Sequence, residues 1–280
     1  VAEVIGGATF AYDYTVRALK AGKSVVTSNK ELVAQKGYEL LELAKENNVN
    51  YFFEASVGGG IPLIRPMHRC MAANEITKFF GILNGTTNYI LTKMAKEGAS
   101  FDAVLKEAQD KGYAERNPSA DVDGFDACRK IAILSSLMMG KNVDSEKIFT
   151  EGITKITADD FVYAKAMGKS IKLLAMSKAL EQGTLAMVSP CMIDSENPLY
   201  GSSACSEYWT GYVPSSGSEE SIEILIHNPH NFGNETAIDE MLSRTALWTD
   251  IEFEKGVLES GKTQRNMGLL FAIISLVVLG

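Results

Sequence analysis

The fold is decided by the opening stretch VAEVIGGATFAYDYTVRALKAGKSVVTSNKELVAQKGYELLELAKENNVNYFFEAS, residues 1–56. Short β-type runs at 1–5, 24–27 and 50–55 alternate with helical patterns at 12–20 and 31–47. Strands that alternate with helices over short connections are typical of a parallel sheet. The stretch therefore predicts an α/β fold and supplies about half of a doubly wound domain.

The regular alternation of predicted strands and helices ends at the glycine-rich residues 58–62. We expect helices at 62–73, 89–96, 101–111, 125–139 and 159–180, and strands at 76–83 and around 185–188. Residues 202–217 are rich in Ser and Gly and predict no regular structure. The second part is therefore expected to be a mixed α+β arrangement, with a domain boundary near Val57.

Composition narrows the class of protein. The chain has 280 residues, 46% of them hydrophobic, which is enough to bury a sizeable core. A net charge of −8 argues against a nucleic-acid partner, which needs a basic patch. The 4 cysteines lie far apart and form no C-x-x-C pair, which favours reduced thiols in a cytoplasmic protein. We expect a small substrate that is recognised locally.

Both ends of the chain look internal to a longer protein. Residues 1–5 lack the basic region and the cleavage signal of a signal peptide. The apolar run 268–280 is shorter than the roughly 20 residues that a membrane-spanning helix needs. We therefore expect a fragment with no membrane partner.

The strongest cluster of reactive side chains lies in residues 112–130. A loop that includes Asp121 runs into a predicted helix on which Asp126 and Lys130 are spaced i, i+4 and share one face. Apolar residues follow, and a buried lysine can exchange its proton near neutral pH, which suits general acid–base catalysis. On spacing alone, the plainer interpretation is preferred: a surface ion pair worth about 0.3–0.5 kcal/mol.

Two polar turns follow predicted strands. Residues 27–30, Thr-Ser-Asn-Lys, stand at the carboxyl end of a strand, where open α/β sheets bind ligands, but Ser28 or Asn29 suits a plain helix cap equally well. Residues 84–88, Asn-Gly-Thr-Thr-Asn, combine a tight-turn pair with many hydrogen-bonding groups. A structural turn is the more common explanation of the second, and a substrate-binding role gains weight only from its neighbours.

Residues 54–62 join a carboxylate to a glycine-rich segment. They lack the glycine order of a dinucleotide-binding fingerprint and of a P-loop, so a domain crossover is the plainer interpretation. A carboxylate beside main-chain carbonyls also suits a monovalent cation, which takes oxygen ligands.

Together these motifs resemble homoserine dehydrogenase, the NAD(P)-dependent oxidoreductase that interconverts L-homoserine and L-aspartate 4-semialdehyde in threonine, methionine and isoleucine biosynthesis. The matching segments are residues 3–7, 20–30, 53–62, 81–90, 112–130 and 156–175. Their order is collinear over about the first 200 residues, which is too regular for a chance similarity. The resemblance implies a partial Rossmann-like parallel sheet followed by an α+β substrate and dimerisation domain.

The same resemblance implies roles for individual residues. Lys130 is expected to transfer the proton, with Lys30 as a second catalytic lysine and Asp126 orienting Lys130. The expected substrate-binding residues are Glu115, Asp121, Asn84, Gly85 and Thr86.

The resemblance also implies NAD(P) as cofactor and a site for a monovalent cation, Na⁺ or K⁺. The expected cofactor-binding residues are Gly6, Gly7, Ser28, Asn29 and Lys30. The expected cation ligands are Glu54 and the main-chain carbonyls of Val57, Gly59 and Ile61.

By the same resemblance the chain divides into three parts, and we expect a homodimer. Residues 1–57 correspond to the C-terminal half of a dinucleotide-binding domain, and 58–202 to the catalytic domain. Residues 203–280 remain unassigned.

Two departures leave a second interpretation open. The family's first βαβ unit with its G-x-G-x-x-G fingerprint is absent, and so is its glycine-rich loop beyond about residue 200. The alternative is therefore a truncated, non-catalytic module that binds a partner. A different semialdehyde dehydrogenase would need a catalytic cysteine, and none of the cysteines lies in a predicted crevice loop.

Overall fold

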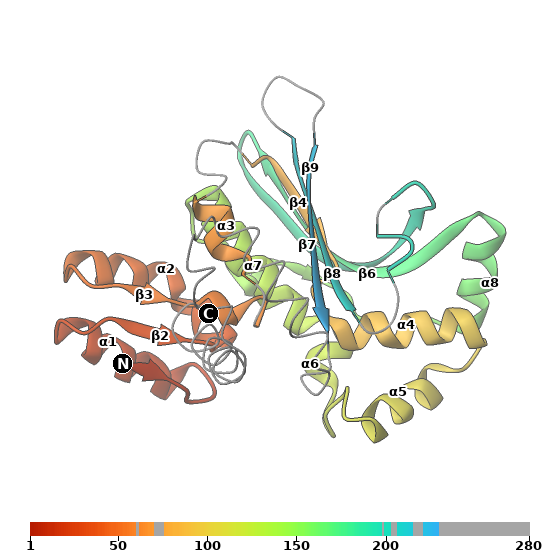
Figure 1. Ribbon diagram of the computed structural model, residues 1–280, viewed down its shortest axis with the longest axis horizontal. Coiled ribbons are helices and arrows are strands. Elements are labelled where there is room, and N and C mark those ends of the chain that lie inside the picture. Colours follow the sequence, from red (N-terminus) through yellow and green to blue (C-terminus); the bar gives the residue numbers. More distant parts are fainter. Residues whose placement is uncertain (60–61, 70–75, 198, 203–205, 215–220, 230–280) are drawn as a thin grey trace, which may run out of the picture. The chain divides into compact units, whose positions relative to one another are not determined.

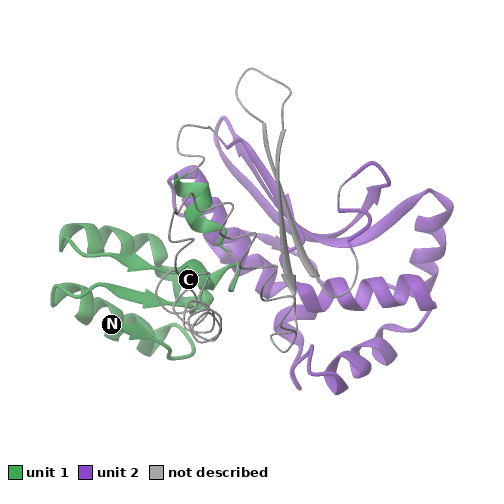
Figure 2. Cartoon of the chain, viewed as in Figure 1, with its two compact units in different colours: residues 1–74, 231–280 green, residues 75–230 purple. Residues whose placement is uncertain are grey.

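The computed structural model describes residues 1–59, 62–69, 76–197, 199–202, 206–214 and 221–229. The chain divides into two compact units, residues 1–74 with 231–280 and residues 75–230 (Figure 2). The division predicted near Val57 stays a prediction.

Unit 1 contains a parallel sheet of three strands in the order β1-β2-β3. Its elements are β1 (Ala2–Glu3), α1 (Thr9–Lys20), β2 (Val25–Thr27), α2 (Lys30–Glu46), β3 (Tyr51–Phe52), the 3₁₀ helix η1 (Glu54–Ser56) and α3 (Ile64–Arg69). The helices bury an apolar stripe that includes Leu19 of α1 and Leu32 and Leu40 of α2, all fully buried. The predicted alternation of strand and helix is confirmed.

Unit 2 is built on a sheet of four strands in the order β4-β6-β7-β5. Its elements are β4 (Lys78–Gly81), α4 (Gly85–Glu97), α5 (Phe101–Asp110), α6 (Ser119–Val122), α7 (Phe125–Met139), the 3₁₀ helix η2 (Ser145–Lys147), β5 (Phe149–Thr150), α8 (Ala158–Ala166), β6 (Lys169–Leu180), β7 (Gly183–Asp194), β8 (Ser206–Pro214) and β9 (Ser221–Pro229). Strands β4, β6 and β7 pair antiparallel, and β5 pairs parallel to β7. Strands β8 and β9 form a separate antiparallel pair.

Helices α4, α7 and α8 pack against the long hairpin of β6 and β7 (Figure 1). Residues 131–134 in the middle of α7 are all apolar: Ile131, Ala132 and Leu134 are fully buried. A helix that is apolar on every side belongs inside a domain. The preceding residues of α7, which include Asp126 and Lys130, are therefore held close to the core.

The helix predicted over residues 159–180 is wrong in its second half. Helix α8 ends at Ala166, Gly168 has the positive φ of 69° that ends many helices, and β6 begins at Lys169. Residues 171–175 are buried on both faces of the strand. A strand covered on both sides reads as one continuous apolar run, which periodicity cannot distinguish from a helix.

Residues 202–217 were expected to have no regular structure, and this too is wrong because β8 occupies residues 206–214. The Ser and Gly around it masked the β-forming run Tyr-Trp-Thr at 208–210. Of the helix predicted over 62–73, the described part contains α3. The predicted fold class, an α/β Rossmann-like sheet followed by a second domain, is confirmed. No helix in the described ranges is both long and apolar enough to cross a membrane.

Candidate functional site

The pair Asp126–Lys130 forms as its spacing predicts. Helix α7 begins after Gly124, whose φ is 86°, and the Lys130 Nζ lies 2.9 Å from the Asp126 Oδ2. The two side chains are only 9% and 7% exposed. The interpretation as a surface ion pair is therefore wrong. In a buried setting the two charges interact far more strongly than at the surface.

Lys130 also donates to the main-chain oxygen of Leu83, at 2.8 Å. Leu83 precedes the turn that leads from β4 into α4, and Asn84 is the N-cap of α4. The Asn84 Oδ1 accepts from the Thr87 N at 2.8 Å, which satisfies a main-chain N–H of the first helical turn. The tight turn expected at residues 84–88 is instead the first turn of α4, and it also contacts the predicted catalytic lysine.

The other end of the Asn84 amide reaches the predicted acidic residues. Its Nδ2 donates to the Asp121 Oδ1 at 2.7 Å and to the Asp126 Oδ2 at 3.0 Å. The fold therefore brings together Asn84, Asp121, Asp126 and Lys130, which are separated by up to 46 positions in the sequence. This group is the candidate functional site of unit 2.

The remaining predicted substrate-binding residues surround the same turn or lie outside it. Gly85 and Thr86 are the buried first residues of α4, and the Thr86 Oγ1 donates to the main-chain oxygen of Tyr113 at 2.9 Å. Glu115 is exposed, and no hydrogen bond among the described residues joins its carboxylate to the candidate site. Its main-chain oxygen accepts from the Gln109 Nε2 at 3.0 Å, which holds the loop to α5.

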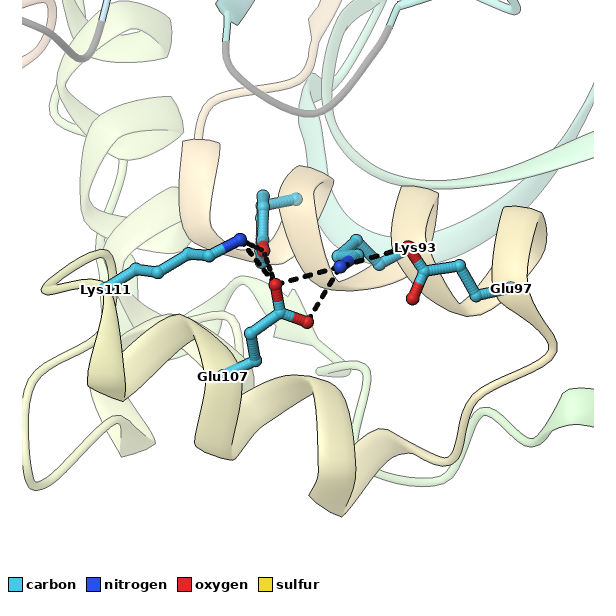
Figure 3. A network of polar contacts seen from close by, with 5 residues as sticks. Lys93, Glu97, Glu107 and Lys111 are labelled. Atoms are coloured by element: carbon cyan, nitrogen blue, oxygen red, sulfur yellow. Dashed lines mark hydrogen bonds and ion pairs between the residues drawn. The ribbon is translucent and has the colours of Figure 1, made fainter.

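A network of charged and polar side chains ties α4 to α5 beside this loop (Figure 3). The Glu107 carboxylate of α5 accepts from the Tyr89 hydroxyl at 2.9 Å and from the Lys93 Nζ at 2.8 Å, and also from the Lys111 Nζ. These donors, Lys111 first, lower the pKa of Glu107 to about 2. The Tyr89 ring packs edge-on against Tyr113, with 5.1 Å between centroids. The network, which the sequence reasoning missed, braces the loop that carries Glu115.

In unit 1 the predicted cofactor residues lie at the carboxyl ends of β1 and β2. The Asn29 Nδ2 donates to the main-chain oxygens of Ile5 and Gly7, at 3.0 and 2.7 Å, and so joins the turns that follow the two strands. Its Oδ1 caps α2 by accepting from the Leu32 N at 3.1 Å. Asn29 therefore caps α2, as the interpretation of residues 27–30 as a helix cap expects. It also joins the two turns at the carboxyl ends of β1 and β2, where the other interpretation expects a ligand.

The buried carboxylate of Glu3 joins the carboxyl ends of β1 and β2 through hydrogen bonds. Glu3 is 5% exposed, and its carboxylate accepts from the Thr27 Oγ1 at 2.5 Å and from the Ile5 N at 2.6 Å. The Thr27 Oγ1 in turn accepts from the Asn29 N at 2.9 Å. Ser28 is exposed, and Lys30 is the half-buried first residue of α2. Lys30 and Lys130 belong to different compact units, so their meeting in one pocket stays a prediction.

Glu54 has main-chain partners. Its carboxylate accepts from the N–H groups of Leu63, Ile64 and Arg65, the last at 2.7 Å. Burial raises the pKa of Glu54, and these donors partly oppose the shift. Val57 is buried and Gly59 has a φ of 61°, while Ile61 lies outside the described residues. The carboxylate thus caps the start of α3, and the cation site stays a prediction.

Comparisons with known proteins bear on both units. A family profile described as "Homoserine dehydrogenase" matches residues 62–228, and one described as "Homoserine dehydrogenase, NAD binding domain" matches residues 1–54. A homoserine dehydrogenase of Bacillus subtilis is 46% identical over 199 residues, which cover 71% of this chain and 46% of that protein. The chain therefore spans about half the length of the curated relatives it matches.

Solved structures agree. A homoserine dehydrogenase from Thiobacillus denitrificans is 34% identical with a TM-score of 0.76, and the match covers 93% of this chain and 59% of that one. A hyperthermophilic archaeal homoserine dehydrogenase in complex with NADPH is 28% identical with a TM-score of 0.67, over 89% of this chain and 70% of that one. The profile matched over residues 62–228 and these relatives agree: the chain belongs to the homoserine dehydrogenase family.

Proposed function

We propose that the protein carrying this chain oxidises L-homoserine to L-aspartate 4-semialdehyde, and catalyses the reverse reduction, with NAD(P) as cofactor. The observation that carries the proposal is the buried Lys130, held by the Asp126 carboxylate at 2.9 Å and by the Leu83 carbonyl at 2.8 Å. A lysine fixed in this way beside the polar side chains of Asn84, Asp121 and Asp126 suits proton transfer at an alcohol or aldehyde oxygen.

Each residue of the candidate site has a part in this proposal. Lys130 takes the hydroxyl proton of homoserine during oxidation and returns it to the aldehyde oxygen during reduction. Asp126 keeps the side-chain nitrogen of Lys130 oriented, as the neutral amine before oxidation and as the ammonium before reduction, and Asn84 fixes Asp126 and Asp121 relative to the turn at 84–86. The exposed Glu115 carboxylate binds the substrate ammonium, and Lys30 is the second catalytic lysine. Oxidation balances as alcohol to aldehyde, with one proton to Lys130 and one hydride to the cofactor.

The strand ends of unit 1 fit the nicotinamide half of a dinucleotide. A Cβ atom at Gly6 or Gly7 would meet no atom within 4 Å, so the turn after β1 leaves space for a flat ligand. Asn29 holds this turn to the end of β2. Gly6, Gly7, Ser28, Asn29 and Lys30 would hold the cofactor, which accepts or donates the hydride when bound. The NADPH complex of the archaeal relative supports this assignment.

The cation has weaker support. Glu54, the expected ligand with a side chain, already accepts main-chain N–H groups on both carboxylate oxygens. This arrangement does not favour Glu54 as a direct ligand, and no step above depends on a cation.

The expected homodimer and cytoplasmic location belong to the same proposal. Leu180 on β6 and Leu185 on β7 share one face of the sheet and are 52% and 50% exposed, and exposed apolar side chains grouped on a sheet favour contact with a second copy. Cys128 and Cys191 are free thiols, as in a reducing compartment. Light scattering on the purified protein should give twice the chain mass, and a monomer at micromolar concentration would contradict the dimer.

The decisive experiment measures NAD(P)-dependent oxidation of L-homoserine by the protein that contains this chain, followed by NAD(P)H absorbance. We expect turnover with homoserine and none with L-serine, whose hydroxyl is one carbon nearer the amino group. NADPH titrated against the chain should quench or enhance tryptophan fluorescence saturably. Failure of both turnover and binding would favour the alternative of a non-catalytic module.

A further inference from the structure

A second buried lysine, Lys172, lies in the middle of β6 and has no part in the chemistry above. It is 4% exposed. Its Nζ donates to the main-chain oxygen of Ser202 at 2.5 Å and to the Asn88 Oδ1 at 3.3 Å. Within the described part of the chain, no carboxylate lies within ion-pair distance of it. Burial of an ammonium group in such a place lowers the stability of the fold, and only its hydrogen bonds offset that cost. We therefore ask what those hydrogen bonds hold in place.

The surroundings of Lys172 oppose its charge. Burial, and then the positive charge of Lys96 on α4, lower the pKa of Lys172 to about 8. A methionine would fill nearly the same space without this cost. What the lysine adds is therefore its polar contacts, and these join β6 to α4 and to the turn that follows β7.

The contact with α4 falls on the first helical turn. Asn88 is 1% exposed, and its Nδ2 has no hydrogen-bond partner among the described residues. The bond from Lys172 is thus the one that orients the Asn88 amide. The Asn88 N donates to the Asn84 oxygen at 3.3 Å, so Asn88 closes the turn whose other end is Asn84.

The substrate turn, residues 83–88, is in this way held by two buried lysines from different elements. Lys130 of α7 binds the Leu83 oxygen at the start of the turn, and Lys172 of β6 binds Asn88 at its end. Helix α4 lies against β6 in unit 2 (Figure 1). Any shift of the turn moves Asn84, and with it the hydrogen bonds to Asp121 and Asp126.

We propose that Lys172 is a positioning residue: through Asn88 it holds the substrate turn in the geometry that homoserine requires, and through Ser202 it fixes the chain that leaves β7. The identity of the substrate rests on the proposed function. The position of the turn does not, so the two can be tested apart.

The test compares Lys172→Met with Lys178→Met. Lys178 lies further along β6 on the same face, but it is exposed, so its replacement controls for loss of a lysine from this strand. For Lys172→Met we expect kcat/KM for homoserine to fall about tenfold or more, chiefly through KM, because small displacements of binding groups weaken productive binding. The KM for NADP⁺ and the thermal midpoint should stay near those of Lys178→Met.

Two further measurements complete the test. Asn88→Ala removes the contact from the other side and should give the same KM change, with no further loss in the double variant. Amide hydrogen exchange should accelerate at residues 84–88 in Lys172→Met and stay unchanged in α5, which can be observed even if the protein does not oxidise homoserine. Equal exchange and equal KM values in the two lysine variants would overturn the proposal, and so would additive effects in the double variant.

Discussion

Lys130 and Asn84 hydrogen-bond the same atom, the Asp126 Oδ2, at 2.9 and 3.0 Å. One residue comes from α7 and the other from the N-cap of α4, so a single carboxylate oxygen joins the proposed proton-transfer group to the proposed substrate turn. Because the contact is buried, loss of Lys130 removes the positive charge that balances Asp126 at a place where water cannot replace it. The following predictions test this arrangement and the elements that support it.

Lys130→Met should lower kcat by about 10²–10⁴-fold, the usual contribution of general acid–base catalysis. It also leaves the Asp126 charge buried, so the variant should lose stability. The double variant Asp126→Asn with Lys130→Met should regain thermal stability but not turnover. Lys106→Met is the matched control, because Lys106 and Asp110 form an i,i+4 pair whose side chains are 73% and 64% exposed. Normal turnover in folded Lys130→Met would contradict the assigned role.

Asn84→Ala should cost about 1 kcal/mol for the lost cap of α4 and should also raise the KM for homoserine. The matched control is Ser100→Ala, which removes the cap of α5, where the Ser100 Oγ accepts from the Ala103 N. Chemical denaturation and steady-state kinetics separate the two effects. If both variants lose similar stability but only Asn84→Ala changes KM, Asn84 serves the site as well as the helix. An unchanged KM for homoserine in both variants would show that Asn84 acts only as the helix cap of α4.

Gly152→Ala should destabilise the protein and disturb substrate binding together. A Cβ at Gly152 would lie 2.1 Å from the Val122 oxygen and 2.4 Å from the Asp123 Cα, so the segment next to Asp121 has to move. The expected loss exceeds about 1 kcal/mol, as for other overpacked sites. Gly201→Ala is the control, since a Cβ there meets nothing within 4 Å. A Gly152→Ala variant with the thermal midpoint of Gly201→Ala would show that the contact is misplaced.

Glu107→Gln should remove an acid-sensitive part of the stability. The folded pKa of Glu107, about 2, lies below its ordinary 4.5, so the unfolded chain binds the proton more readily. Its contribution is therefore complete above about pH 4.5 and is lost as the pH falls toward 2. Unfolding measured from about pH 6 down to about pH 3 should show a shallower decline in Glu107→Gln than in the wild type. Asp110→Asn on the exposed face of α5 should follow the wild type. High salt should shrink the difference, because the Glu107 and Lys111 side chains of the network are 32% and 47% exposed and so reach solvent.

Lys172 should make the free energy of unfolding depend on pH in the alkaline range. Its folded pKa of about 8 lies below the ordinary 10.5, so the unfolded chain binds more protons between these values. The free energy of unfolding should consequently rise, through this group, as the pH increases from about 8 to about 10.5. The difference in stability between wild type and Lys172→Met, measured at about pH 7.5 and about pH 10, isolates the effect from other titrating groups. A difference independent of pH would show that the ammonium group is not desolvated.

Local rules predicted much of unit 1 and the helices of unit 2. The predicted helix at 125–139 has the bounds of α7, and that at 31–47 differs from α2 by one residue at each end. Asn29 was predicted as a possible helix cap, because capping depends on a side chain and an N–H group two or three residues away. Asn84 was assigned to a turn instead, and α4 begins four residues before the helix predicted at 89–96. Helix and cap interactions are short in sequence, which is why a pattern can reveal them.

The candidate site was predictable only in part. Asp126 and Lys130 are near neighbours on one helix, and their pairing follows from spacing. That Asn84 reaches the same carboxylate depends on how β4 and α7 pack, and no local rule gives this. Lys172 was missed because the apolar run around it was assigned to a helix, although a lysine between Ile171 and Leu173 in a buried run was a usable signal.

Local sequence patterns established the alternation of strand and helix in unit 1, a helix cap at Ser28 or Asn29, and the i,i+4 spacing of Asp126 and Lys130. The tertiary structure decided that residues 169–180 form a strand, that this ion pair is buried, and that two lysines hold one turn. The reason is the range of the interactions. Helix caps and i,i+4 contacts act between near neighbours in the chain, whereas burial, and with it the strength of a charge pair, depends on the elements that cover it.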